Sequence, residues 1–211
     1  MSRSTPQTTR RAPAAPARRG RPSRRAEIFA AALRLFRSRG FHATSINDIG
    51  AEAGVAGTAI YSHFATKQEL LAEAIREGAG RIGAGMRDAV AADAATADAA
   101  LENVVRGYVE VVLENADMNA CYVLESRSLD SEVGEPLLRG ERGLRTAWRD
   151  RLLAARPELT ANEAQTMVQM AVFSIVALCM HRSRIERDAL VELATSFVLG
   201  ALRSPVPNPN P

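Results

Sequence analysis

The stretch that decides the fold is "TSINDIGAEAGVAGTAIYSHFATKQELL", residues 44–71. Its apolar residues recur at helical spacing in two short segments, which are separated by a turn around Gly54. Either Thr44 or Ser45 can cap the first helix, and the second is expected from about Gly57 to Phe64. Two short helices joined by such a tight turn form a helix-turn-helix. The second helix then exposes four polar side chains: Thr58, Tyr61, Ser62 and His63.

Helical patterns continue on both sides of this stretch. Ser23 is a suitable N-cap for a helix that Gly40 ends, and one face of that helix is apolar. Thr66 caps a following helix with apolar residues at helical spacing up to Ile75. Residues 23–75 are therefore predicted to form a DNA-binding domain of three helices, in which the start of this following helix is included.

The remainder of the chain also reads as helices. After an alanine-rich linker at about 91–97, helical patterns cover residues 101–112, 122–124, 136–152 and 188–203. Thr160 and Glu163 form a capping box that opens another helix, expected to run to about Arg182. No segment alternates apolar and polar residues in the manner of a strand. The prediction is an all-α protein of about nine helices, in which residues 76–203 form a larger C-terminal domain.

Both ends of the chain are expected to be disordered. Residues 1–22 lack periodicity, and residues 204–211 contain four prolines. Residues 1–25 hold eight arginines and no acidic residue, which leaves the rest of the chain at −5. Such a basic arm favours a polyanionic partner, with nucleic acid ahead of a membrane. The alternative is a solvated tail of an arginine-rich protein in which Lys67 is the only lysine.

Several other classes of protein lack support in the sequence. No apolar run was found to reach the roughly 18 residues that span a bilayer. The two cysteines are far apart, so neither a metal site nor a disulfide framework is expected. Motifs for nucleophilic, metal or nucleotide chemistry are missing, so we expect no enzyme and no cofactor. The expected location is the cytoplasm.

A glycine-rich stretch at residues 77–85 contains the pattern GxGxxG, from Gly78 to Gly83. In dinucleotide enzymes this pattern lies between a strand and a helix, where amide groups meet a pyrophosphate. Here it follows a helical segment, so a dinucleotide site is not expected. Because each glycine weakens a helix, the segment is predicted to be weak, bendable or interrupted. Gly80 and Gly83 are the candidate hinge between the two domains.

The segment from Arg24 to Ile75 resembles the DNA-binding domain of the tetracycline-repressor (TetR) family of bacterial regulators. The resemblance rests on "LF" at residues 35–36, Gly40, "TSINDI" at 44–49, "AGV" at 53–55 and "IYSHFATK" at 60–67. It covers about a quarter of the chain. The sequence departs from the family pattern at Ala56, where a serine or threonine is usual.

The resemblance implies roles for individual residues. Contacts to DNA phosphates are expected from Thr44, its neighbour Ser45, Tyr61, His63 and Lys67, and contacts near base edges from Gly57, Thr58, Ala59 and Ser62. In the arm, Arg19 and Arg21 belong to an RGRP sequence similar to an AT-hook, which binds the narrow minor groove. With few base-reading side chains in the recognition helix, specificity is expected to depend on DNA shape and on this arm.

In this family the last two helices form the dimer interface, and the penultimate helix also borders a ligand cavity. The expected interface residues are Ile175, Val176, Cys179, Leu193 and Phe197. The expected cavity residues are Tyr108, Val112, Tyr122, Trp148, Met170 and Phe173, for each of which a place in the ordinary core is the competing interpretation.

These features together predict a ligand-responsive repressor that binds a palindromic operator in double-stranded DNA as a homodimer. A small apolar inducer would release it. The stretch from Leu124 to Leu159 is similar to regulators of fatty-acid and acyl-CoA metabolism, which makes a fatty acid or an acyl-CoA the expected inducer. The alternative is a constitutive or architectural DNA-binding protein without a ligand.

Overall fold

The computed structural model describes residues 23–125, 129, 131–181 and 183–206. All regular structure in these residues is helical, as the sequence predicted. The elements are α1 (Arg24–Arg39), α2 (Ile46–Ala53), α3 (Gly57–Ile60), α4 (Lys67–Ala91), α5 (Ala97–Glu114), α6 (Ala116–Glu125), α7 (Ser131–Ala155), α8 (Ala161–Ala177), the 3₁₀ helix η2 (Leu178–Met180) and α9 (Arg187–Arg203).

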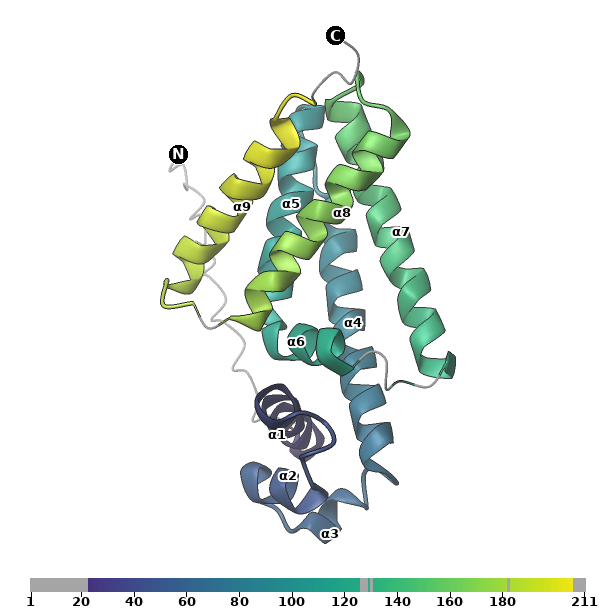
Figure 1. Cartoon of the computed structure of the whole chain (residues 1–211), viewed down its shortest axis with the longest axis vertical. Coiled ribbons are helices and arrows are strands. Elements are labelled where there is room, and N and C mark those ends of the chain that lie inside the picture. Colours follow the sequence, from purple (N-terminus) through teal and green to yellow (C-terminus); the bar gives the residue numbers. More distant parts are fainter. Residues whose placement is uncertain (1–22, 126–128, 130, 182, 207–211) are drawn as a thin grey trace, which may run out of the picture.

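The helices form a small lower unit and a taller bundle. Helices α1, α2 and α3 lie at one end of the molecule, and α4 runs from there into a bundle with α5, α7, α8 and α9 (Figure 1). The short helix α6 crosses the base of the bundle directly above α1 (Figure 1). This arrangement leaves α3 at the tip of the molecule, away from the bundle.

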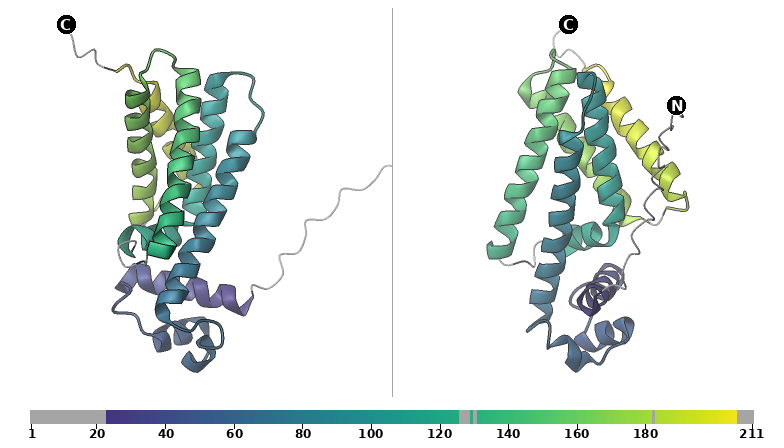
Figure 2. Two further views of the ribbon diagram at one scale, coloured as in Figure 1. Left: turned by 90° about the vertical axis from the view of Figure 1, so that its right-hand side faces the viewer. Right: turned by 180° about the vertical axis from the view of Figure 1, so that it is seen from behind.

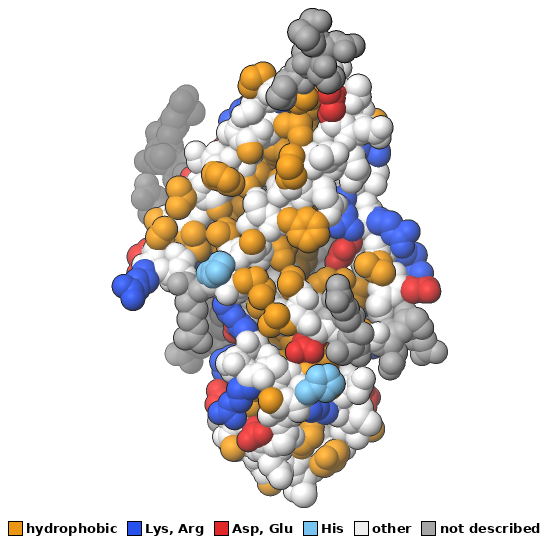
Figure 3. Space-filling model, viewed as in Figure 1, with side chains coloured by type: hydrophobic (Ala, Val, Ile, Leu, Met, Phe, Trp, Pro, Cys, Tyr) orange, Lys and Arg blue, Asp and Glu red, His pale blue; other side chains and the backbone are white. Residues whose placement is uncertain are grey.

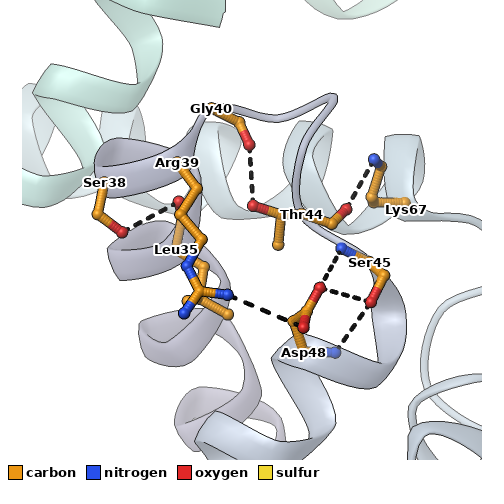
Figure 4. Close-up of polar contacts among 8 residues, drawn as sticks. All are labelled: Leu35, Ser38, Arg39, Gly40, Thr44, Ser45, Asp48 and Lys67. Atoms are coloured by element: carbon orange, nitrogen blue, oxygen red, sulfur yellow. Dashed lines mark hydrogen bonds and ion pairs between the residues drawn. The ribbon is translucent and has the colours of Figure 1, made fainter.

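Local capping groups set the ends of the first helices. The Ser23 hydroxyl accepts a hydrogen bond from the Ala26 N–H at 3.2 Å, and Gly40, with φ of 85°, ends α1. At α2, Ser45 rather than Thr44 is the N-cap, and it forms a capping box with Asp48 (Figure 4). Gly54 adopts a left-handed conformation with φ of 68°, which turns the chain out of α2 as predicted.

A glycine within α2 brings the two helices of the motif together. A Cβ on Gly50 would lie 2.8 Å from the Val55 carbonyl oxygen and 3.0 Å from the Gly57 nitrogen. Only glycine therefore fits where the backbone after the turn passes over α2. This contact sets the position from which α3 begins.

Helix α3 is shorter than the sequence predicted. Regular α-helix ends at Ile60 instead of Phe64, and the chain continues as a hydrogen-bonded turn through His63. The N-cap residue, Ala56, provides no side-chain hydrogen bond, so this end of the helix lacks the usual stabilisation. The Ser62 hydroxyl also donates to the Ala59 carbonyl oxygen at 2.7 Å, which competes with regular helical geometry.

The buried apolar residues form two clusters that meet at α6. The N-terminal cluster is built from α1 to α4 and includes Ile28, Phe36 and Ile60. The C-terminal cluster lies within the bundle and includes the fully buried Trp148. Cys121 of α6 belongs to the N-terminal cluster although it lies far along the chain. Helix α6 is therefore packed into the core of the N-terminal unit.

The glycine-rich stretch does not interrupt its helix. Helix α4 is continuous over 25 residues and passes from the N-terminal unit into the bundle (Figure 2). Gly78 lies against the side chain of Met118 on α6, and a Cβ on Gly85 would lie 3.0 Å from Val111 of α5. These glycines allow close helix packing, whereas Gly80 faces open space. The expected interruption is therefore wrong, because packing against α5 and α6 stabilises a helix that its own residues would weaken.

Two later helices differ from expectation at their ends. Helix α7 begins at Ser131, before the predicted start, so that Pro136 lies inside it. Helix α8 changes to the 3₁₀ helix η2 after Ala177. Arg156 donates to the carbonyl oxygens of Leu202 and Ser204 at 2.8 and 2.7 Å, which holds the start of the C-terminal tail. Residues 1–22 and 207–211 lie outside the described part of the chain.

Candidate nucleic-acid interface and ligand region

The segment after the turn presents the polar surface that the sequence predicted for DNA. Thr58, Ala59, Ser62 and His63 are exposed, and Tyr61 keeps 57% of its surface accessible. Ile60 between them is fully buried and anchors the segment to the N-terminal cluster. These exposed side chains belong to the segment at the tip of the molecule, and the other described residues leave them accessible (Figure 1).

Thr44 does not have the position expected for a phosphate contact. Its side chain is only 1% exposed, and its hydroxyl donates to the Gly40 carbonyl oxygen at 2.8 Å (Figure 4). Its role is to close the turn between α1 and α2, because the loop that leaves Gly40 folds back over it. Ser45 is exposed, but its hydroxyl belongs to the capping box with Asp48.

Lys67 has a structural role that the sequence did not predict. Its ammonium group donates to the carbonyl oxygens of Phe41 and Thr44 at 2.7 and 2.9 Å. It also lies 4.3 Å from the centroid of the Phe41 ring, in cation–π geometry. Lys67 therefore ties the start of α4 to the α1–α2 turn. Its expected phosphate contact stays a prediction for the third N–H of the ammonium group.

The N-terminal domain carries little net positive charge. Residues 23–75 include six basic and five acidic residues. Several of these charges are paired with one another, as in Arg34–Glu52 at 3.0 Å and the pair of Arg25 with Glu73. The arm holds most of the arginines of the N-terminal region, but Arg19 and Arg21 lie outside the described residues.

Helix α6 is hydrogen bonded near its start to α1 and at its end to the turn that follows α1. Near its start, Asp117 accepts a hydrogen bond from Arg37 of α1 at 2.5 Å. At its end, the buried carboxylate of Glu125 accepts a hydrogen bond from the Phe41 N–H at 2.9 Å. Arg37 also donates to the Cys179 carbonyl oxygen in η2 at 2.7 Å. These contacts join residues 80 and more positions apart, so no local pattern could have predicted them.

Residues 28–74 match the model of a protein family described as bacterial regulatory proteins, tetR family. The matched residues run from α1 into α4 and include the whole helix-turn-helix. The N-terminal domain is a tetR-family domain. The family is one of regulatory proteins and not of enzymes, in agreement with the prediction from sequence.

Curated relatives of this tetR-family domain are transcriptional repressors. The repressor KstR2 of Mycobacterium tuberculosis is 41% identical over 54 residues, which are 26% of this chain and 27% of KstR2. KstR2 of Rhodococcus jostii is 37% identical over 57 residues, or 27% of this chain and 28% of the relative. The sequence similarity therefore spans only about a quarter of these relatives and of this chain.

Similarity of fold extends over most of the molecule. The tetR-family regulator PfmR of Thermus thermophilus superposes with a TM-score of 0.71 at 20% identity, over 87% of this chain and 98% of PfmR. The ketosteroid transcriptional regulator KstR2 of M. tuberculosis gives a TM-score of 0.72 at 24% identity, over 84% of this chain and 94% of KstR2. At this level of identity the similarity establishes the fold of the C-terminal domain.

The residues expected to line a ligand cavity separate into two groups in the C-terminal domain. Tyr108, Val112 and Trp148 are buried between α5 and α7, and Tyr122 is half-buried on α6. Met170 and Phe173 are each 61% exposed, so they do not line an interior site in this structure. Helix α8 is apolar nearly all round, and spacing alone could not tell which apolar side faces inward.

The expected dimer residues separate in the same way. Ile175 and Cys179 are each 1% exposed and lie in the C-terminal core, so they are not available to a partner. Val176 is half-buried. Leu193 and Phe197 of α9 are 55% and 67% exposed. Two predictions for this part of the chain are therefore reversed. Ile175 and Cys179, which were expected at the interface, lie in the core, whereas Met170 and Phe173, which were expected in the cavity, lie on the surface.

An exposed apolar surface runs over α8 and α9. We call Met170, Phe173, Leu193 and Phe197 the α8–α9 face, and Figure 3 shows apolar side chains gathered over these helices. The helical stretch Ala161–Met180 is even long and apolar enough to cross a membrane by length and composition, contrary to the expectation from sequence. A core helix with a second apolar side meets the same criterion, and the inward side of α8 packs in the bundle.

Burial controls the protonation of the thiols and of the phenol in the interior. It raises the pKa of Cys121 to about 12 and that of Cys179 to about 11. It also raises the pKa of the Tyr108 hydroxyl well above its usual range. All three groups are therefore neutral at physiological pH. The described residues contain no group of three or more side chains that could hold a metal ion.

Proposed function

We propose that this protein is a ligand-responsive transcriptional repressor that binds a palindromic operator as a homodimer in the cytoplasm. The observation that carries the proposal is a tetR-family domain whose polar recognition surface is exposed at one end of an otherwise helical molecule. The printed names of the curated relatives, which are transcriptional repressors, support the same function.

Contacts to base edges would come from Gly57, Thr58, Ala59 and Ser62, with Tyr61 and His63 at neighbouring phosphates. None of these side chains makes the bidentate contact that gives strong base discrimination. Since residues 23–75 have nearly balanced charge, most of the attraction to phosphate would come from the arginine-rich arm. Arg19 and Arg21 would lie in the adjacent minor groove, where DNA shape contributes to specificity.

The α8–α9 face is suited to a second copy of the same chain. Its four side chains keep 55–67% of their surface exposed, and covering this apolar surface is favourable by roughly 25 cal/mol per Å² removed from water. A palindromic operator requires two recognition surfaces related by a two-fold axis, about 34–36 Å or a multiple apart. Pairing of two identical α8–α9 faces provides such an axis.

The ligand would act through the C-terminal domain. Four of the expected cavity residues are buried or half-buried: Tyr108, Val112, Tyr122 and Trp148. An apolar molecule such as a fatty acid or an acyl-CoA would suit their surroundings. The neighbour KstR2 is called a ketosteroid regulator, which extends the range of apolar candidates to steroid-like molecules. Because Asp117 and Glu125 of α6 bond α1 and the turn after it, a ligand that moves α6 would reorient the DNA-binding domain.

One observation favours the alternative, a constitutive DNA-binding protein without a ligand. The side chains around Trp148 are packed together, and two hollows on the surface of the described residues lie elsewhere. One of them is formed by α1 and α4 near Phe29, and the other lies at the α4–α5 connection near Arg151. A thermal-shift screen with fatty acids, acyl-CoAs and steroids separates the two functions, since only a protein with a ligand site is stabilised by a ligand.

The decisive experiment is footprinting of the purified full-length protein on the DNA that flanks its own gene. Protection of an inverted repeat is the expected result. Removal of residues 1–22 should weaken binding and reduce its dependence on salt, because released counterions follow the number of phosphate contacts. Exchange of Phe197 for Glu should abolish binding to the repeat by preventing pairing. Failure to protect any site there or in genome-wide binding would refute the proposal.

A further inference from the structure

The indole nitrogen of Trp148 is a buried donor without a partner. Trp148 lies fully buried on α7, and its Nε1–H has no hydrogen-bond acceptor among the described residues. Buried polar groups in proteins are hydrogen bonded in the large majority of cases. An indole nitrogen can only donate, so the missing partner is an acceptor atom.

The ring of Tyr108 contacts this indole, and two charged side chains of α7, Glu141 and Arg145, lie near Tyr108. The Tyr108 ring of α5 meets Trp148 edge-on, with 5.3 Å between ring centroids. On α7, Glu141 and Arg145 precede Trp148 at helical spacing, and Arg145 donates to the Glu141 carboxylate at 3.2 Å. Burial and the nearby Glu141 carboxylate raise the pKa of the Tyr122 hydroxyl on α6 above its usual range. We call these five residues the Trp148 cluster.

The charges within the Trp148 cluster are already balanced. Glu141 has Arg145 as its ionic partner and lies near the Tyr122 hydroxyl. The cluster therefore offers no free cation to a carboxylate ligand, and a carboxylate placed beside Glu141 would be repelled. An uncharged acceptor avoids this repulsion and the cost of burying an unpaired charge.

The cluster also reaches the surface at its polar edge. The Glu141 side chain is 36% exposed and Tyr122 is half-buried, whereas Trp148 lies among the apolar residues of the C-terminal core. A molecule that enters between α6 and α7 would pass the polar residues and end in apolar surroundings. Such a molecule would be apolar over most of its length and would carry one oxygen atom that reaches the indole nitrogen.

We propose that the ligand of this protein is an apolar molecule with an uncharged carbonyl oxygen, which accepts a hydrogen bond from Trp148 Nε1. This inference rests on the proposed ligand-responsive function and narrows its ligand class. Ketones and thioesters share the required chemistry, whereas a free fatty acid does not. Entry of the ligand separates α6 from α7 at Tyr122, and α6 transmits this movement to α1.

The test compares probes that differ in the carbonyl group. Palmitoyl-CoA is compared with hexadecyl-CoA, the thioether that lacks the carbonyl, and 5α-pregnane-3,20-dione with 5α-pregnane. Palmitate is the carboxylate probe. Affinities are measured by calorimetry for the full-length protein and for Trp148→Phe, whose fold is checked by circular dichroism. Because Trp148 is the only tryptophan, the indole N–H gives a single side-chain resonance in a ¹H–¹⁵N spectrum.

One carbonyl probe is expected to bind about 10-fold more tightly than its carbonyl-free match, as one added hydrogen bond predicts. The same probe should move the indole resonance downfield, and Trp148→Phe should remove the preference. The pair that shows this preference tells whether the ligand is a thioester or a ketone. Equal affinities within both pairs, a preference unchanged in Trp148→Phe, or binding of palmitate as tight as that of the carbonyl probes would overturn the inference. If no probe binds while the operator is still protected, the inference fails and the DNA-binding function stands.

Discussion

Replacing Arg37 with alanine removes the two hydrogen bonds that join α1 to α6 and η2. The bond to the Cys179 carbonyl lies in partly buried surroundings, where a hydrogen bond from a charged group contributes about 1.5–3 kcal/mol. The pair with Asp117 contributes less than about 1 kcal/mol, because the aspartate side chain is 46% exposed. The expected loss of stability for Arg37→Ala is about 1.5–4 kcal/mol, or roughly 3–16 °C in the unfolding temperature of a chain of this length.

A matched control lies one turn earlier on the same helix. Arg34 pairs with Glu52 at 3.0 Å, but both side chains are more than 40% exposed. Arg34→Ala should therefore cost less than about 1 kcal/mol. Both variants and the unchanged protein are compared by thermal unfolding at one protein concentration, since dimerisation makes the unfolding temperature depend on concentration.

Binding to DNA provides a second measurement on the same variants. If Arg37 positions the DNA-binding domain, Arg37→Ala should weaken binding to a full inverted repeat more than binding to an isolated half-site. Arg34→Ala should change the two by the same factor. Equal destabilisation by the two substitutions, or equal effects of Arg37→Ala on both DNA sites, would refute the proposed role of Arg37.

Three further predictions follow from packing and protonation. Gly107→Ala should cost about 1–3 kcal/mol in thermal unfolding, since its Cβ would lie 2.5 Å from a Cβ of α4, whereas Gly80→Ala, which faces open space, should add about 0.5–1 kcal/mol. The raised pKa and burial of Cys121 should keep it from reacting with a thiol reagent at about pH 8 until the protein unfolds, and prompt labelling would contradict this. Hydrogen bonds from Ser45 lower the pKa of Asp48, so the stability that they provide is present above the ordinary carboxyl pKa and is lost as pH falls through the lowered value. Asp48→Asn should reduce this loss of stability at acid pH, measured by urea unfolding at several pH values, and an unchanged pH profile would argue against it.

The N-terminal domain shows how far local sequence signals extend. Ser23 and Thr66 cap their helices as predicted, and Gly54 adopts the left-handed conformation that its turn requires. The length of α3 was predicted less well, because a missing cap at Ala56 and the hydrogen bond of Ser62 shorten the helix. Each of these effects involves residues only a few positions apart.

In the C-terminal domain, composition identified apolar helices but not the direction of their faces. Helix α8 carries apolar residues on two sides, and only packing against α5, α7 and α9 buries Ile175 while leaving Phe173 exposed. The glycines of α4 looked like a point of weakness by helix propensity. In the folded chain Gly78 and Gly85 instead allow neighbouring helices to approach closely.

The sequence by itself determined the helical class, the helix-turn-helix and most helix ends, because caps, turns and apolar periodicity act between near neighbours along the chain. Tertiary structure alone decided that Thr44 is buried, that Lys67 bonds two carbonyl oxygens of a distant turn, and that Arg37 joins α1 to η2. The bonds of Lys67 and Arg37 join groups from 23 to 142 positions apart, which only the packed chain brings within hydrogen-bond distance.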